Sequence, residues 1–227
     1  PIQRFIQTFR ESAASAIAVY WVTEAIVKKT ICFATLTALL VFTTLATAQT
    51  QSPAGVPVFK VSPVSSKITF HVDASSKIDG TFNKWDASLT FASTEVSTAV
   101  LDIEIQAASV DTGSGIKNKT LEGKDFFDVD KDPLITFKST KVVQNGPNTF
   151  EVDGNFTIRG VTKPEKLSVV MSGKGTGSGS ITGTMAFDRK DYGMNSGIPF
   201  MKIANRVEVS VDLKGNRISG PPPSFKQ

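Results

Sequence analysis

The chain has 227 residues, of which 25 are Lys or Arg and 21 are Asp or Glu, so its formal net charge is +4 at pH 7. Residues 1–48 hold four of the basic and two of the acidic residues, which leaves residues 49–227 with a net charge of only +2. This small excess, without a basic stripe interleaved with aromatic residues, argues against a nucleic-acid-binding surface. The single cysteine is Cys32, so disulfides and thiolate metal sites are excluded from residues 49–227.

Residues 27–48 have the features of a secretory signal peptide. The pair Lys28-Lys29 precedes an uncharged stretch, residues 30–48 (TICFATLTALLVFTTLATA), which ends in a small-x-small pattern. A basic start, an apolar middle and such an end predict cleavage by a signal peptidase, here after Ala48. The alternative is a transmembrane anchor, for which this threonine-diluted stretch is barely long enough.

The remaining boundaries follow from composition. The chain begins at Pro1 and has no methionine before Met171. Residues 1–26 are therefore expected to be a non-native upstream extension or disordered. Residues 49–57 (QTQSPAGVP) form a polar lead-in, residues 58–215 are predicted to form one β-barrel domain, and residues 216–227 a flexible C-terminal tail.

The main signal in the predicted domain is the alternation of apolar and polar residues. Successive side chains on a strand point to opposite faces, so each such run predicts a half-buried strand with one wet side, which is typical of antiparallel pairing. With their hairpin partners, the runs predict about eight strands. They are residues 67–72, 101–106, 150–158, 167–171, 181–187 and 207–213.

Turn-forming residues separate these runs. Residues 144–148 (QNGPN) predict one hairpin loop and residues 173–179 (GKGTGSG) another, since the latter glycines lack the spacing of phosphate-binding loops. Residues 114–122 (SGIKNKTLE) predict the one internal helix, capped by Ser114 or Thr112 and ended at Gly123. A meander of this kind hides its edges by closing on itself. The predicted fold is therefore all-β, an antiparallel eight-stranded barrel with one short helix.

Catalytic candidates are few. His71 is the only histidine, and its alternation with Phe70 and Val72 places it on the polar face of a strand. A solvated histidine is the favoured interpretation there, and a ligand or base is the alternative. Nucleophilic catalysis needs a base beside an activated hydroxyl or thiol. The sequence thus predicts no enzyme and no catalytic residue.

The acidic residues suggest one possible metal site, in the run from Asp128 to Asp132. Asp128, Asp130 and Asp132 have the spacing of the first calcium ligands in an EF-hand loop. However, Pro133 and Ser139 stand where such a loop requires glycine and glutamate. An acidic turn is favoured over a weak cation site, so no metal is predicted.

The apolar phase of the strands is rich in aromatic residues. They indicate either a filled core or the wall of a ligand cavity, because an eight-stranded barrel can do either. Small inward residues, Gly154, Gly183 and Ala99, favour internal space, and the residues alone leave both interpretations open. The candidate lining residues are Phe70, Phe82, Trp85, Leu101, Ile103, Phe126, Phe127, Phe137, Phe156, Met185, Phe187, Met194 and Phe200.

Several fragments in a fixed order give the chain a resemblance to the YceI-like family of periplasmic proteins over about residues 58–215. Each fragment is weak alone, and their order and spacing carry the similarity. They are residues 68–70 (ITF), 79–82 (DGTF), 108–113 (ASVDTG), 121 with 123–129 (L and GKDFFDV), 133–140 (PLITFKST), 154–164 (GNFTIRGVTKP) and 188–193 (DRKDYG).

The resemblance implies an extended, lipocalin-like barrel with a long internal pocket. It also implies a periplasmic protein that binds a polyisoprenoid, an isoprenoid quinone or a similar lipid as carrier or store, in a family associated with stress responses. The expected partner is the apolar lipid, with transient membrane contact and a monomeric or homodimeric state; no further cofactor is implied. Polar candidates for head-group contacts are Lys119, Arg159, Arg189 and Tyr192.

One segment departs from the family pattern. Many members carry an Arg-Asp-x-His-Leu-like stretch before the Phe-Phe pair, where this chain has Lys117-Asn118-Lys119-Thr120-Leu121. The acid and the histidine are missing, so the resemblance does not define the head-group preference. Two other functions stay open at this stage. One is a stress-protective interaction module with a filled core, and the other is a hydrolase or isomerase acting on a bound lipid.

Overall fold

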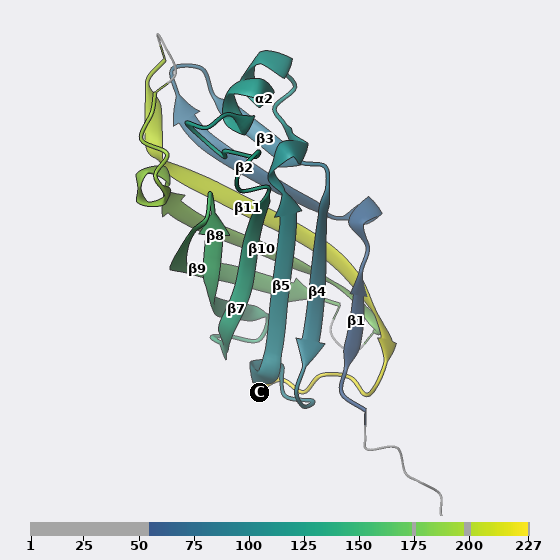
Figure 1. The fold of residues 1–227 in the computed structure, drawn as a ribbon. Helices are drawn as coiled ribbons and strands as arrows, with labels where there is room; N and C mark the ends of the chain where they lie inside the picture. The colour runs from purple at the N-terminus through teal and green to yellow at the C-terminus, as the bar shows by residue number, and fades with distance from the viewer. Residues whose placement is uncertain (1–54, 174–175, 198–200, 227) are drawn as a thin grey trace, which may run out of the picture. The chain divides into compact units, whose positions relative to one another are not determined.

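The computed structural model describes residues 55–173, 176–197 and 201–226 (Figure 1). The predicted signal peptide and upstream extension lie outside these residues, as does the candidate lining residue Phe200.

The described chain contains eleven β-strands, one α-helix and four short 3₁₀ turns. The strands are β1 (Val58–Val61), β2 (Lys67–Ala74), β3 (Ile78–Phe82), β4 (Trp85–Phe91), β5 (Ala99–Gln106), β6 (Val110–Asp111), β7 (Leu134–Gln144), β8 (Thr149–Ile158), β9 (Val161–Ser172), β10 (Ser178–Asp188) and β11 (Ile203–Ser219). The helix is α2 (Gly115–Glu122), and the 3₁₀ turns are η1 (Pro63–Ser65), η2 (Val96–Thr98), η3 (Ala107–Ser109) and η4 (Arg189–Tyr192).

These segments form a closed antiparallel barrel of eight long strands, as the sequence predicted. Three of the long strands are interrupted: β1 and β2 by η1, β3 and β4 by Asn83-Lys84, and β5 and β6 by η3. The two halves of each interrupted strand keep the same neighbouring strand. The β1–β2 strand pairs with the β3–β4 strand through β1–β4 and β2–β3, and the β3–β4 strand pairs with the β5–β6 strand through β4–β5 and β3–β6. The breaks explain why eleven segments make an eight-stranded meander.

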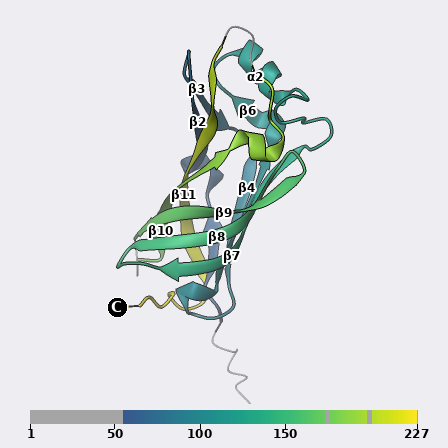
Figure 2. The same ribbon diagram turned by 90° about the vertical axis from the view of Figure 1, so that its left-hand side faces the viewer.

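Closure depends on β11, which is the longest strand. Its first half pairs with β2 and its last residues pair with β1, while its other edge pairs with β10 along residues 178–188. At about 3.3 Å per residue, its 17 residues extend roughly 55 Å. One strand therefore spans the barrel from end to end. We call the end that carries α2, β2, β3 and β6 the upper end, and the end with the β7–β8 turn and the C-terminal residues the lower end (Figures 1 and 2).

The alternation that predicted the strands also determines the core. On β2, Ile68, Phe70 and Val72 are buried while their neighbours are exposed or half-buried, and β5 shows the same pattern. One strand changes phase within its length. A β-bulge between Ser139 and Lys141 shifts β7 against β8, and the backbone N–H of Leu101 donates to the buried Ser139 hydroxyl at 2.8 Å.

Helix α2 begins as the sequence predicts. The Ser114 side chain caps it by accepting from the Lys117 backbone N–H, and Gly123 follows its last residue. Leu121 is the buried residue of the helix. Thr112, the other candidate cap, donates its hydroxyl to the Asn118 side chain at 2.7 Å and so connects the helix to the strand before it.

The C-terminal residues differ from the predicted flexible tail. Residues 216–219 belong to β11, so the sheet extends beyond the predicted limit at residue 215. Residues 220–226, which we call the C-terminal strap, then hydrogen-bond to two loops at the lower end. A proline-rich polar tail gave no periodic signal, because its order comes from contacts distant in sequence.

The small inward residues do not leave the space that the sequence suggested. A Cβ atom on Gly154 would lie 2.4 Å from Cζ of Phe137 and 2.9 Å from the Lys138 carbonyl oxygen. A Cβ atom on Gly183 would lie 3.1–3.3 Å from Val211 and Leu167 side-chain atoms. Large side chains on neighbouring strands therefore occupy the room that these glycines provide.

We expect Gly154→Ala to destabilise the fold by about 1 to 3 kcal/mol, because the added methyl overpacks the core against an aromatic ring and a backbone oxygen. Urea denaturation measures this cost. Gly197→Ala is the control, since a Cβ atom there meets nothing within 4 Å. The penalty should shrink when Phe137 is replaced by Leu, and an equal penalty in both backgrounds would contradict the assignment.

Candidate functional site

An apolar pocket, which we call the upper pocket, lies inside the upper end of the barrel. Leu121 of α2 and the Phe126-Phe127 pair that follows the helix form part of its wall, together with inward residues of the strands. Among the described residues that line it, Arg189 is the one charged residue and the others are hydrophobic. The lining is Phe70, Val72, Ile78, Phe82, Ile105, Leu121, Phe126, Phe127, Ile135, Phe156, Ile158, Phe187, Arg189, Met194, Ile203, Val207 and Val209.

Seven of the apolar residues singled out in the sequence line this pocket. They come from four strands and from the segments after α2 and η4. Their rings contact one another: Phe70 and Phe82 have centroids 5.5 Å apart, and Phe82 and Phe127 5.9 Å apart. The seven are Phe70, Phe82, Phe126, Phe127, Phe156, Phe187 and Met194.

Arg189 is buried, and its guanidinium is held by backbone carbonyl groups. Its Nε donates to the Ala204 oxygen at 3.1 Å, and one Nη donates to Ser196 at 2.8 Å and to Met194. A buried charge needs such partners. The side chain thus fastens the segment after η4 to the start of β11.

Next to Arg189, the barrel wall has a seam without backbone pairing. In the described chain, β9 and β10 pair over Ser168–Ser172 and Ser180–Thr184, and their upper halves separate. Turn η4 lies at this seam: the Tyr192 hydroxyl donates to Glu165 of β9 at 2.8 Å, and Lys163 Nζ lies 3.3 Å from Asp191. Burial, and then the bond to Glu165, raises the pKa of the fully buried Tyr192.

The predicted head-group residues therefore have partners within the protein. Arg159, at a positive φ of 55° in the β8–β9 turn, donates to the Gly193 carbonyl. Lys119 is exposed and pairs with Glu122 at 2.6 Å, which raises the Lys119 pKa. Of the four candidates, Arg189 alone lines the upper pocket. A contact between any of them and a lipid head group remains a prediction.

Four more predicted lining residues form a packed belt at mid-height. Leu101, Ile103, Phe137 and Met185 are each at most 7 % exposed and line neither end pocket. Phe137 lies opposite Ile103 on one side and Phe156 on the other. Trp85 is half-buried, packs against the core and lies opposite Ile105 of β5. The belt lies between the two end pockets, whose described lining residues do not overlap.

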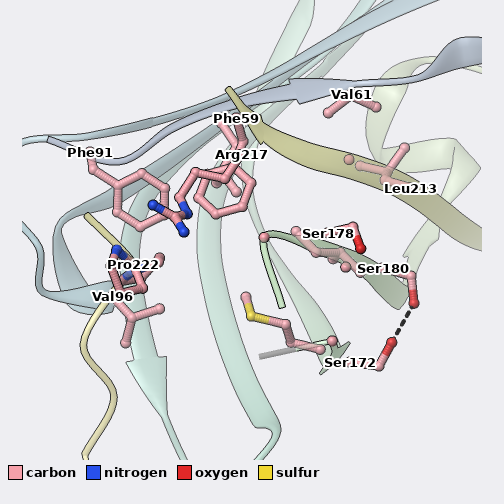
Figure 3. Close-up of a pocket in the computed structure, with 18 of the residues that line it drawn as sticks. Phe59, Val61, Phe91, Val96, Ser172, Ser178, Ser180, Leu213, Arg217 and Pro222 are labelled. Carbon is pink, nitrogen blue, oxygen red and sulfur yellow. Dashed lines mark hydrogen bonds between the residues drawn. The ribbon is translucent and has the colours of Figure 1, made fainter. Parts of the chain in front are cut away.

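A second apolar pocket, the lower pocket, lies at the opposite end, and sequence reasoning missed it (Figure 3). Its apolar wall includes Phe59, Phe91 and Leu213, and its rim includes Ser172, Ser178 and Ser180, as the close-up shows. Residues 222, 223 and 225 of the strap also line it. Alternation places Leu213 inward, but only the folded strap completes this pocket.

On the outside of the barrel, His71 is the centre of a small acidic cluster. Its Nδ1 lies 2.5 Å from Asp79 Oδ1 and its Nε2 lies 3.3 Å from Asp73 Oδ1. These hydrogen bonds, that to Asp79 first, raise the His71 pKa above its usual 6.5. The side chain faces away from the core and is about one-third exposed, which agrees with the predicted polar face.

The acidic run from Asp128 to Asp132 shows no grouping suited to a metal among the described residues. Within the described residues, no three His, Cys, Asp or Glu side chains gather in such a way. Asp132 lies beside Gly160, and its Oδ2 is 3.9 Å from Lys131 Nζ.

Among the described elements, no helix is long and apolar enough to cross a bilayer.

Sequence comparisons connect this barrel with known proteins. The family model of the YceI-like domain matches residues 59–215. A UPF0312 protein of Pseudomonas savastanoi pv. phaseolicola is 31% identical over 145 residues, which cover 62% of this chain and 74% of the relative. A UPF0312 protein of Yersinia pestis is 41% identical over 96 residues, covering 42% of this chain and 50% of the relative.

Solved structures share the fold. Burkholderia cenocepacia BcnA superposes with a TM-score of 0.62 at 24% identity, covering 68% of this chain and 99% of BcnA. A polyisoprenoid binding domain from Saccharophagus degradans, implicated in plant cell wall breakdown, has a TM-score of 0.59 at 13% identity and covers 71% and 99% of the two chains. At these identities the likeness establishes the fold.

The His71 cluster leads to a prediction about pH. Because the folded-state pKa is raised, its stabilising contribution is present in full below about pH 6.5 and is lost as the pH rises through the raised value. The wild type should therefore melt at a higher temperature than His71→Gln, and this difference in melting temperature should be largest at low pH. Calorimetry from about pH 6 to about pH 9 measures this difference. A difference that grows with pH would contradict the assignment, and Asp79→Asn should flatten it.

Proposed function

Because the chain belongs to the YceI-like family and its barrel encloses an apolar pocket, we propose that it binds a long-chain apolar lipid as a periplasmic carrier or storage protein. The proposed ligand is a polyisoprenoid, an isoprenoid quinone or a similar lipid, with its chain in the upper pocket. The observation that carries the proposal is the upper lining, whose described residues are hydrophobic except for Arg189.

The lining suits a chain that makes no hydrogen bonds. Transfer of apolar surface out of water contributes about 25 cal/mol per Å², so several hundred Å² of chain offset the entropy lost when a flexible lipid is ordered. Nε and one Nη of Arg189 donate to the backbone carbonyls of Ala204, Ser196 and Met194, which compensates much of the cost of its charge in this environment. Binding in this pocket would rest on shape and burial.

The size of the pocket limits how much of a chain it holds. Its enclosed part has a volume of about 60 Å³, well below the range of about 300 to 1,000 Å³ that small-molecule pockets have. A longer chain must extend past the mouth or displace the belt around Phe137 and Met185. If a long chain displaces the belt, the belt residues that the sequence predicted as ligand contacts would contact that chain.

Two further arguments support the proposal. The solved Saccharophagus degradans domain of the same fold is described as polyisoprenoid binding, which makes such a lipid the first ligand to test here. The pattern of residues 27–48 supports export, with cleavage after Ala48. Mass spectrometry of the secreted or periplasmic protein tests this, since a mature N-terminus at Gln49 is expected.

The packed belt is the observation that favours an alternative to lipid binding, namely a stress-protective module whose filled core binds no lipid. A third possibility, hydrolysis or isomerisation of a bound lipid, has no observation in its favour, and we propose a non-enzymatic binding protein. Turnover of a prenyl substrate by the purified protein would contradict this proposal.

Lipid extraction distinguishes the carrier from the alternative. Organic extraction of the purified protein followed by mass spectrometry should yield a prenyl, quinone or other long-chain species in near-stoichiometric amount. Repeated recovery of empty protein that also fails to bind added ubiquinone would favour the protective module.

A matched pair of variants tests the location. Ile203→Lys places a charge on a half-buried upper-pocket residue, where an unpaired charge is costly next to an apolar chain, so the amount of bound lipid should fall at least about tenfold. Glu104→Gln changes an exposed side chain on β5 and should leave loading unchanged. Both proteins should give wild-type circular dichroism spectra, and full loading of a folded Ile203→Lys variant would contradict the upper-pocket site.

A further inference from the structure

We propose that the lower pocket is a second, separate binding site, which takes the hydrocarbon chain of an anionic single-chain amphiphile, and that the C-terminal strap forms one wall of it. This inference goes beyond the proposed function, because the site shares no lining residue with the upper pocket.

The separation of the two sites follows from the order of inward residues along single strands. On β10, Ile181 lines the lower pocket, Gly183 and Met185 follow at the belt, and Phe187 lines the upper pocket. At about 3.3 Å per residue, Ile181 and Phe187 are roughly 20 Å apart. The space at Gly183 between them is filled by Val211 and Leu167.

The strap is held in place by hydrogen bonds to two loops. Ser224 accepts from the Val96 N–H at 3.1 Å and donates its own N–H to Thr94 at 2.7 Å. Lys226 donates its N–H to the Gln144 side chain and accepts from it, at 2.8 and 2.9 Å. These bonds attach the strap to the β4–β5 connection and to the end of β7.

This attachment brings hydrophobic residues of the strap to the pocket. Pro222, Pro223 and Phe225 line it, and the Phe225 ring lies 6.2 Å from the ring of Phe150 in the core. Phe59 and Phe91, whose ring centroids are 5.7 Å apart, also line the pocket. An apolar chain among these side chains would be shielded from water.

The rim favours an anionic head group. Ser172, Ser178 and Ser180 lie at the rim, where the Ser172 and Ser180 hydroxyls hydrogen-bond to each other at 2.8 Å, and Arg217 is the one charged residue among the described residues that line the pocket (Figure 3). A shallow hollow on the outer side of the same β9–β10 loop shares these serines and adds Lys214. Among the described residues, none that lines either hollow is acidic. A carboxylate at the rim of the pocket would therefore meet Arg217, while Lys214 adds positive charge on the outer face of the loop.

Arg217 also connects the head-group side to the strap, since its guanidinium donates to the Gly220 carbonyl at the start of the strap. A bound anion would contact the same side chain that holds the strap. The enclosed part of the pocket is about 70 Å³, close to the volume of the upper pocket, so a single chain must extend past the mouth or displace the strap.

The experiment uses the purified full chain and dansylaminoundecanoic acid, an anionic single-chain probe, with its uncharged methyl ester as the comparison. Ile181→Lys alters the lower pocket and Ile203→Lys the upper one, and both isoleucines are half-buried on strands. We expect Ile181→Lys to weaken acid binding at least about tenfold and Ile203→Lys to change it less than about twofold. Circular dichroism and thermal melting verify that both variants are folded.

Two rim and strap variants complete the test. Arg217→Gln should reduce the preference for the acid over the ester, and Phe225→Ala should weaken both probes several-fold, because Phe225 lines the wall. Binding that is lost in Ile203→Lys and retained in Ile181→Lys would overturn the second site while supporting the upper-pocket proposal. Equal loss in both variants would overturn the separation of the sites. Unchanged affinity in both, or in Phe225→Ala, would overturn the lower site or the role of the strap.

Discussion

The structure depends on the closure of its backbone hydrogen-bond ladder through β11. A strand edge without a partner must be paired, covered or charged, and this barrel pairs its first and last long strands along both halves of one 17-residue strand. Closure forces the inward side chains of all strands into one enclosed volume. The packing of those side chains then decides whether the volume is core or cavity.

That packing divides the interior by height. At mid-barrel, large side chains pack against the glycines, as Phe137 does against Gly154, so the middle of the interior is filled. Toward each end the strands are covered by non-strand segments, which are α2, the Phe126-Phe127 pair and η4 above, and the C-terminal strap below. Helices, turns and straps do not follow the pleat of the sheet. The two pockets lie where these segments meet it.

The sequence predicted most of the fold and part of the candidate site. Period-two alternation indicated which face of each strand is buried, and Ser114 and Gly123 delimited the helix, because these signals are local. The bulge at Ser139 and the order of residues 216–226 depend on partners far along the chain, so no local pattern predicted them. Alternation predicts which face of a strand is buried but not the position of a residue along the barrel axis. It therefore does not distinguish Phe137 and Met185, which lie in the belt, from Phe82 and Phe127, which line the upper pocket.

The polar residues also show what a local sequence pattern cannot predict. Sequence reasoning treated Arg159, Arg189 and Tyr192 as available to a ligand, yet each makes a hydrogen bond around the unpaired seam between β9 and β10. Polar groups buried at such a gap must be satisfied by the protein itself. Because Nε and one Nη of Arg189 already donate to backbone carbonyls, the upper pocket has few polar means of discriminating between head groups. Selectivity there would follow from the width and length of the apolar chain, whereas Arg217 at the lower rim is placed to recognise charge.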